Sequence, residues 1–149
     1  DEIIGQIPKN ARLRYVYEYG VDALAHMTGE RKVDANGAVT WEAVKGISRK
    51  GHMVYGPYAQ LPIGKYLVLF RLKRTSGDRG VAAILDTCVA GAPKSSAIKE
   101  LSASELPINK YRSVALIFNH PGGAYESRIF WPGSVSLAID RIMLWEIVQ

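Results

Sequence analysis

Two aromatic residues stand beside proline-glycine corners, where a side chain can turn outward from the end of a strand. Trp131 lies in F-W-P-G-S, and Tyr58 follows directly after Gly56-Pro57. A ring held at such a corner can stack on a flat apolar face of a ligand. Two structural alternatives stay open. Trp131 can cap the edge of the core, and Tyr58 can close the fold with its hydroxyl bonded to the backbone.

A charged pair shares a segment with Trp131. Glu126 and Arg128 alternate with Phe130 in Y-E-S-R-I-F-W, so a strand would place all three on one face. Such a pair is either a surface ion pair that contributes little to stability or the polar floor of a concave site. Planar carboxylate and guanidinium groups give directional hydrogen bonds to a ligand. The candidate binding residues are therefore Trp131, Tyr58, Arg128 and Glu126.

The residues that catalysis or metal binding would need form no recognisable pattern. No G-x-S-x-G, phosphate-loop or H-E-x-x-H motif occurs, and the three histidines lack metal-ligand spacing. Asp86 and Glu126 could serve as paired carboxylates, but nothing in the sequence pairs them. The single Cys88, in A-A-I-L-D-T-C-V-A, indicates a core thiol. We expect a protein that is not an enzyme and that has no metal site.

Length and composition indicate one soluble globular domain. The chain has 149 residues, of which 48% are hydrophobic and 22% charged. No apolar run is long enough for a membrane helix, and no signal-peptide pattern opens the sequence, which leaves the compartment open. The net charge of +5 favours acidic partners. Because the basic residues come in scattered pairs and no recognition motif occurs, we expect neither a nucleic acid nor a membrane as partner.

Alternating hydrophobicity predicts strands along most of the chain. Residues 12–19 and 65–73 alternate with period two, and turn signals at 34–37 and 61–64 separate such segments. The pattern predicts an all-β fold, an antiparallel sandwich of jelly-roll type with about eight to nine strands. Residues 1–11 form a lead-in and 12–149 a single domain. The G-P-Y corner predicts a sheet edge or a strand end.

The turns divide into two groups if successive strands run antiparallel. Turns at 59–64, 89–110 and 131–134 would share one end with Tyr58 and Trp131; the segment 89–110 reads as a long polar connection in which a short helix can form within 95–105. Turns at 45–51, 74–79 and 119–124 would share the other end. A basic rim is expected there, formed by Arg49, Lys50, Arg74, Arg79 and His120. Arginine forks match planar anions, so this rim is either a site for an anionic ligand or a solvated surface.

Two further motifs resemble a known fold family. A P-x-G-x-Y turn leads into the central strand, and an I-D-x-I-x-L pattern closes the chain. The matching residues are Pro62, Gly64 and Tyr66, then Ile139, Asp140, Ile142 and Leu144. These motifs resemble galactose-binding-like jelly-roll domains, and within them carbohydrate-binding modules of the family 6 and family 35 type. The resemblance covers roughly residues 20–147.

Modules of this kind often hold a structural calcium ion between two early glutamates and an acidic residue of the last strand. Asp22 and Asp140 occupy comparable positions here, but Leu24 stands where a second early carboxylate would be. Calcium takes about six to eight oxygen ligands. The carboxylate pattern therefore does not support the ion, and we expect Asp140 to be paired or capped at a sheet edge.

The resemblance implies a non-catalytic carbohydrate-binding module that recognises a polysaccharide or oligosaccharide. It also implies a secreted or cell-envelope location and a tether to a catalytic domain. Two alternatives stay open: a protein-interaction or structural domain of a multidomain protein, and a small glycan-active hydrolase.

Overall fold

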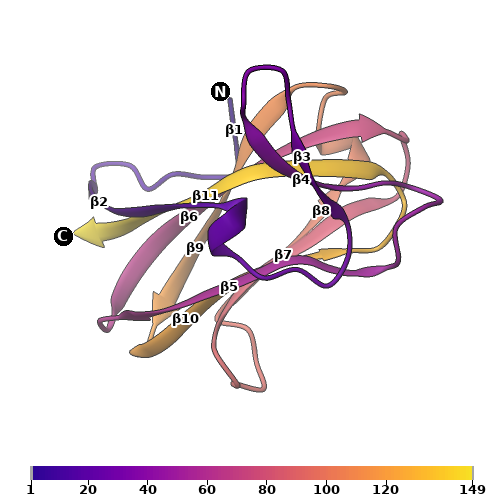
Figure 1. Ribbon diagram of the computed structural model, residues 1–149. Helices are drawn as coiled ribbons and strands as arrows, with labels where there is room; N and C mark the ends of the chain where they lie inside the picture. The colour runs from indigo at the N-terminus through magenta and orange to yellow at the C-terminus, as the bar shows by residue number, and fades with distance from the viewer. Residues whose placement is uncertain (1, 149) are drawn as a thin grey trace.

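A computed structural model describes residues 2–148 and confirms the all-β class. Two sheets pack face to face (Figure 1). Their strands are β1 (Ile3–Ile4), β2 (Arg12–Gly20), β3 (Glu30–Val33), β4 (Val39–Ala43), β5 (Gly51–Leu61), β6 (Gly64–Ser76), β7 (Val81–Val89), β8 (Ala97–Ser102), β9 (Tyr111–His120), β10 (Gly123–Trp131) and β11 (Ser136–Val148). Two short 3-10 helices, η1 (Val21–Ala23) and η2 (Ala103–Glu105), complete the described elements.

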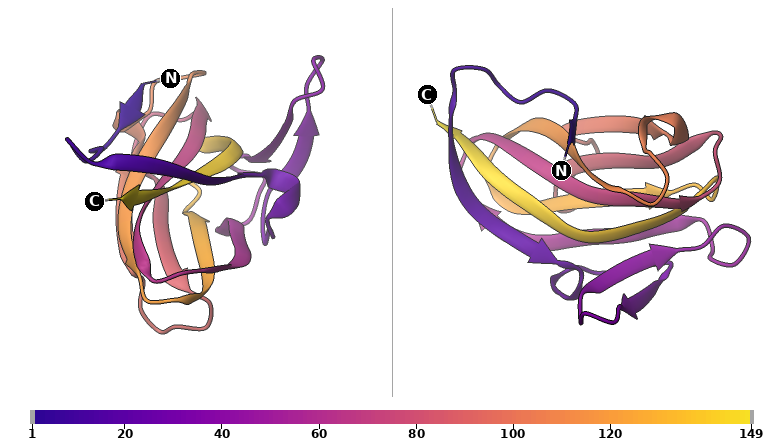
Figure 2. Two further views of the ribbon diagram at one scale, coloured as in Figure 1. Left: turned by 90° about the vertical axis from the view of Figure 1, so that its left-hand side faces the viewer. Right: turned by 90° about the horizontal axis from the view of Figure 1, so that it is seen from above.

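The larger sheet has seven strands and the smaller sheet has four. The larger one runs in the order β1-β9-β6-β11-β4-β3, with β2 also paired to β11, and the smaller one runs β5-β10-β7-β8. Neighbouring strands are antiparallel except β1, which lies parallel to β9. The β3–β4 hairpin stands out from the body of the sandwich (Figure 2). No helix among residues 2–148 is long and apolar enough to cross a membrane.

Strand β6 follows the predicted alternation closely. Tyr66, Val68, Phe70 and Leu72 are each at most 2% exposed and belong to the core between the sheets. Tyr66 stacks on Phe118, whose ring in turn stacks on Tyr125 of the facing sheet, with centroids 5.5 and 5.4 Å apart. Aromatic rings thus bridge the two layers and fix their separation.

The opposite side of β6 carries a second, smaller apolar cluster. Leu67 and Leu69 pack there with Ala115 and Ile147, and Ala11 of the N-terminal segment covers them. This outward face is therefore not simply a solvated surface. It divides into an apolar part near the N-terminal segment and a polar part near the β3–β4 hairpin.

A register shift interrupts β2, where the sequence alone predicts unbroken alternation. Tyr15 pairs with Trp145 and Tyr17 with Leu144, and the shift falls between these two partners. Leu144 belongs to the core, whereas Trp145 packs against the outer cluster. Tyr15 and Tyr17 consequently face opposite sides, because one extra residue in a strand reverses the side-chain direction.

The G-P-Y corner lies on a sheet edge, as predicted, but it does not end its strand. β5 is the outermost strand of the four-stranded sheet and continues through Pro57 to Leu61. An edge strand tolerates proline because its missing N–H would face away from the neighbouring strand. The connection 89–110 also differs from the expectation. It contains the strand β8, which was not predicted, while the short helix expected within 95–105 is present only as the three-residue 3-10 helix η2.

Candidate functional site

The outer face of the four-stranded sheet gathers most of the polar residues predicted to bind. In β10, Tyr125, Ile129 and Trp131 point into the core, which leaves Glu126, Arg128 and Phe130 on the outer side. Register pairing sets residues of both neighbouring strands beside them. Cys88, Asp86 and Ile84 of β7 lie on one side, and Pro57, Tyr55 and His52 of β5 on the other. The strand therefore places Glu126, Arg128 and Phe130 on one face, as predicted.

Tyr58 joins this face through an unusual backbone conformation. A register shift between Tyr125 and Glu126 leaves Tyr58 without a direct partner in β10, and its φ of 68° lies in the left-handed region. Such a conformation is strained for a tyrosine and persists where the surroundings over-determine it. Gly56 has a φ of 112°, a backbone conformation that side-chain-bearing residues rarely adopt, and it lies beneath the Tyr58 ring. The Tyr58 side chain remains 46% exposed.

Glu126 is a buried acid held by two protein donors. It is 6% exposed. Tyr58 Oη donates to its Oε2 over 2.8 Å, and Cys88 Sγ donates to its Oε1 over 3.3 Å. Burial raises the pKa of Tyr58 to about 12, with the Glu126 hydrogen bond adding to the effect. Burial likewise raises the pKa of Cys88 to about 11. Both donors therefore stay protonated at neutral pH and satisfy the carboxylate, which would be costly to bury alone.

Arg128 forms a forked ion pair with Asp86 on the next strand. Arg128 Nε donates to Asp86 Oδ1 over 3.0 Å, and Arg128 Nη2 contacts Oδ2. Ser95 adds a hydrogen bond of 2.6 Å to Oδ2. The hydrogen bonds to Asp86 are the main reason that the pKa of Arg128 lies above the ordinary value for arginine. The guanidinium group is thus fixed in orientation, with about a third of its side chain exposed at 31%.

The two carboxylates of this face are not arranged as a free catalytic pair. Every oxygen of Asp86 and Glu126 accepts from a protein donor. A glycosidase acid needs a carboxyl that can exchange protons with the substrate. The arrangement instead suits the orientation of polar groups for hydrogen bonding to hydroxyls.

A histidine and an aromatic ring extend the face beyond Arg128. His52 meets the ring of Phe130 edge to face, with centroids 5.4 Å apart. Burial lowers the pKa of His52, and the positive charge of Arg128 lowers it further. His52 is therefore a neutral donor and acceptor at neutral pH. Rings and oriented polar groups together run from Tyr58 along the strands to Phe130, a combination suited to an elongated polyhydroxylated ligand.

Trp131 does not belong to this site, and the prediction that it stacks on a ligand is wrong. Its indole is 1% exposed and lies in the core between the sheets. Its Nε1 donates to the backbone carbonyl of Val135 over 2.8 Å. The Pro-Gly corner folds back over the ring instead of turning it outward. The alternative reading, a tryptophan at the edge of the core, is the one that holds.

The predicted grouping of the turns is wrong because the connection 89–110 contains a strand, β8. One extra strand reverses the direction of all later strands, so the turn at 121–122 lies with the β5–β6 turn: Gly122 lies close to Ile63. The turn at 132–135 lies with the β6–β7 turn, where Gly77 and Gly80 lie close to Ser134. Trp131 and Tyr58 are therefore not neighbours at one end.

The basic rim is only partly assembled. His120 is 2% exposed, and its Nε2 lies 3.0 Å from the carbonyl of Gly123, so it is buried at the opposite end from the others. Arg74 is committed to two backbone carbonyls, those of Leu106 and Gly77. Arg79 is exposed beside Asp78. Arg49 and Lys50 are exposed in the β4–β5 connection. Surface arginine and lysine side chains remain at this end, but they form no joint pocket with His120.

The two acidic residues considered for calcium each pair with an arginine. Arg31 donates to both carboxylate oxygens of Asp22, over 2.9 and 3.0 Å. Asp140 contacts Arg71, which agrees with the expectation that it is paired. Among residues 2–148, no group of three or more histidine, cysteine, aspartate or glutamate side chains could hold a metal ion.

Comparison with known proteins identifies the fold. No family profile matches the chain, and no curated protein matches its sequence. Among solved structures, the C-terminal family 6 carbohydrate-binding module of LamC, a laminarinase from Zobellia galactanivorans, superposes with a TM-score of 0.60 at 12% identity, over 86% of this chain and 97% of that one. The family 6 module of Cellvibrio mixtus lichenase 5A, solved with cellotriose, gives 0.57 at 14% identity, over 87% and 96%.

A third similar structure belongs to a much larger enzyme. A family GH115 4-O-methyl-α-glucuronidase matches 95% of this chain with a TM-score of 0.58 at 12% identity, but only 19% of that enzyme is covered. The fold is therefore the β-sandwich seen in these family 6 carbohydrate-binding modules, in agreement with the resemblance of the sequence motifs. At these identities the likeness defines the fold and leaves the ligand to be argued from the site.

Proposed function

We propose that this chain is a non-catalytic carbohydrate-binding module that holds a polysaccharide against the outer face of the four-stranded sheet. The observation that carries the proposal is the pairing of Tyr58 with Glu126. It anchors a ring that is 46% exposed above a buried carboxylate. The exposed ring stacks on the apolar face of a sugar, Arg128 donates hydrogen bonds to its hydroxyls, and Glu126 holds the Tyr58 ring in place from beneath.

Two features of the face favour a sugar polymer over another ligand. The Arg128 charge is paired with Asp86, and the Glu126 carboxylate is buried and hydrogen-bonded by Tyr58 and Cys88. A neutral ligand therefore meets no exposed, unpaired charge. The polar groups also lie on neighbouring strands of an open sheet, which gives room for several consecutive sugar units.

The proposal extends to the setting of the module. The chain resembles modules found in a laminarinase and a lichenase, and it matches one part of a large glucuronidase. These likenesses support a tether to a catalytic domain and a secreted or cell-envelope location. The module would then raise the local concentration of the enzyme on its polymer.

Affinity electrophoresis tests the proposal. The wild type is run in native gels that contain laminarin, lichenan, xylan or polygalacturonate. We expect at least one neutral polymer to retard it, and Tyr58→Ala to reduce the retardation about tenfold in apparent affinity, as loss of one stacking contact with its hydrogen bond would.

Tyr15→Ala is the matched control, because Tyr15 is comparably exposed, at 56%, but lies on the other sheet. Two results would overturn the proposal. In one, no polymer retards the wild type although it is folded. In the other, Tyr15→Ala removes the retardation and Tyr58→Ala does not. A stable protein partner recovered in the first case would favour the protein-interaction alternative.

A further inference from the structure

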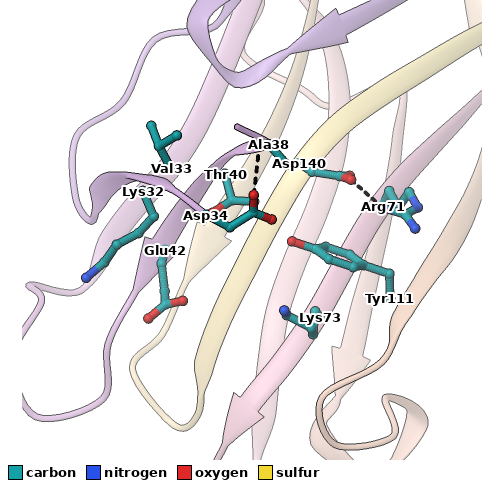
Figure 3. Close-up of a pocket in the computed structure, with 10 residues that line it drawn as sticks. All are labelled: Lys32, Val33, Asp34, Ala38, Thr40, Glu42, Arg71, Lys73, Tyr111 and Asp140. Atoms are coloured by element: carbon teal, nitrogen blue, oxygen red, sulfur yellow. Dashed lines mark hydrogen bonds and ion pairs between the residues drawn. The ribbon is translucent and has the colours of Figure 1, made fainter. Parts of the chain in front are cut away.

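A polar pocket of about 480 Å³ lies on the other side of the molecule from Tyr58. It opens between the β3–β4 hairpin and the outer face of the seven-stranded sheet (Figure 3). Its lining draws on five strands, β3 among them, and includes Thr40 and Glu42 of β4, Arg71 and Lys73 of β6, Tyr111 of β9 and Asp140 of β11. All six are half-buried, so their polar groups are partly removed from water.

The hairpin that forms one wall is held in shape by its own turn. Asp34 Oδ1 accepts from the backbone N–H groups of Asn36 and Ala38, over 2.8 and 3.0 Å. The Asp34 N–H also donates to the Ala38 carbonyl over 3.0 Å. Gly37 supplies the positive φ of 82° that the turn needs. The wall is thus a structured element that stands above the sheet.

The floor of the pocket is a tyrosine enclosed by two cations. The Arg71 guanidinium carbon lies 4.3 Å from the centre of the Tyr111 ring, and Lys73 Nζ lies 4.8 Å from it. Figure 3 shows the two cations on opposite sides of the ring, with the hydroxyl directed toward the hairpin. Because both faces of the ring are covered, a ligand cannot stack on Tyr111. Recognition here must rest on hydrogen bonds.

Several polar atoms of the pocket lack hydrogen bonds within the described chain. The Tyr111 hydroxyl and Asp140 Oδ1 are buried without a partner. Glu42 and Thr40 make no side-chain hydrogen bond or ion pair among residues 2–148, and the Lys73 ammonium group contacts only the Tyr111 ring there. Buried polar atoms without partners are costly and are usually satisfied by a ligand or water.

The charges of the lining select the kind of ligand. Lys32, Arg71 and Lys73 are balanced by Asp34, Glu42 and Asp140, all of which line the pocket. An anionic ligand would meet the free Glu42 carboxylate, and a cationic one would meet the free Lys73 ammonium. A ligand rich in hydroxyl groups avoids both conflicts, because each hydroxyl can donate to Glu42 and accept from Lys73.

We propose that this pocket is a second carbohydrate site, which takes a single neutral pyranose unit through hydrogen bonds to Lys73 and Glu42 and without ring stacking. The choice of a sugar rests on the function proposed above, but the site itself is separate from the Tyr58 face. The two sites lie on opposite sheets and use different chemistry, so each can be removed without the other.

The test is a ¹H–¹⁵N correlation NMR titration with methyl β-glucoside, methyl β-galactoside, methyl β-xyloside and, as an anionic comparison, methyl β-glucuronide. We expect at least one neutral glycoside to shift the amides of Thr40, Glu42 and Lys73 in a saturable way. Glu42→Gln and Lys73→Met should each weaken that binding about five- to tenfold, since each removes a charge-assisted hydrogen bond.

Asp78→Asn is the control, because it removes one acidic charge from an exposed turn outside the pocket. It should leave the titration unchanged. Unfolding by urea, compared between wild type and variants, shows that each variant is folded.

Three results would overturn the second site: no saturable shift with any neutral glycoside, tighter binding of the glucuronide, or shifts confined to the Tyr58 face. Gel retardation separates this failure from that of the proposed function. A polymer that still retards the protein in a Tyr58-dependent way leaves the first site intact. Saturable shifts in the pocket without any gel retardation would support the second site and contradict the proposed function of the Tyr58 face.

Discussion

The hydroxyl of Tyr58 donates to Glu126 Oε2 over 2.8 Å, although the two residues are 68 positions apart in sequence. The contact joins an edge strand to its inner neighbour and couples an exposed ring to a buried charge. The position of the ring therefore depends on the carboxylate, and the carboxylate depends on the ring for one of its two protein donors.

This coupling predicts non-additive effects on stability. Tyr58→Phe should lower the free energy of unfolding by about 1–2 kcal/mol, because it removes a hydrogen bond to a buried charged group. After Glu126→Gln, the same change should cost less, because the acceptor no longer carries a charge. Urea unfolding of the two single variants and the double variant gives the coupling energy.

Tyr15→Phe is the matched control for that cycle, since the Tyr15 hydroxyl has no hydrogen-bond partner among residues 2–148. It should change stability by less than about 0.5 kcal/mol. Strict additivity of Tyr58→Phe and Glu126→Gln would show that the contact has no energetic weight in solution.

Trp131 should matter for folding and not for binding. Trp131→Phe deletes part of a core side chain and leaves the Val135 carbonyl without its donor. We expect a loss of about 1–3 kcal/mol in unfolding free energy and an unchanged affinity for any polymer that retards the wild type. If Trp131→Phe remains folded but is no longer retarded, Trp131 takes part in binding and this prediction is wrong.

Cys88 should be inert in the native protein. Its side chain is 2% exposed, and burial raises the pKa of the thiol to about 11, so little thiolate exists at pH 8. Reaction with Ellman's reagent should therefore be slow until urea unfolds the chain, and its rate should follow the unfolding transition. Rapid labelling in the absence of urea would mean that the outer face opens at Cys88.

His52 gives the stability a defined pH dependence. Burial, followed by the nearby Arg128 charge, lowers its pKa below the ordinary value of 6.5, while Asp86 and Glu126 act in the opposite direction. The unfolded chain therefore binds a proton more readily than the native protein, and stability rises with pH in this range. The stabilising contribution is complete above pH 6.5 and is lost as the pH falls through the lower native pKa.

Urea unfolding at several pH values from 7.5 down to 5 would measure this effect. His52→Gln should be less sensitive to acid than the wild type over that interval, since it has no group to titrate at this position. Parallel curves for the two proteins would contradict the assignment.

Much of the fold follows from alternation alone. The core face of β6 and the common face of Glu126, Arg128 and Phe130 both follow from counting residues by twos, because nothing interrupts these stretches. Counting fails in β2, where a register shift places Tyr15 and Tyr17 on opposite sides. A shift of this kind arises from pairing with β11 and leaves no mark in the residues of β2 itself.

The site was harder to foresee than the fold. Tyr58 and Glu126 were both predicted to bind, but their contact depends on the left-handed conformation of Tyr58 and the register of β5 against β10. Asp86, Ser95 and His52 complete the face, yet only register pairing brings them together. The prediction for Trp131 is wrong because a Pro-Gly corner can turn a ring inward as readily as outward. Packing into the core, which the corner motif does not encode, sets the direction.

The six residues of β8 have an effect far beyond their own place in the sheet. The turns of this sandwich lie at its two ends, here called poles. In a chain of successive antiparallel strands, each added strand moves every later turn to the opposite pole. The last strand has 13 residues, so the poles are about 40 Å apart at ~3.3 Å per residue. Removing β8 alone would send the turn before β11 to the opposite pole, whereas removing β8 together with one neighbour would restore it. Strands in this architecture can therefore be gained or lost most easily in pairs.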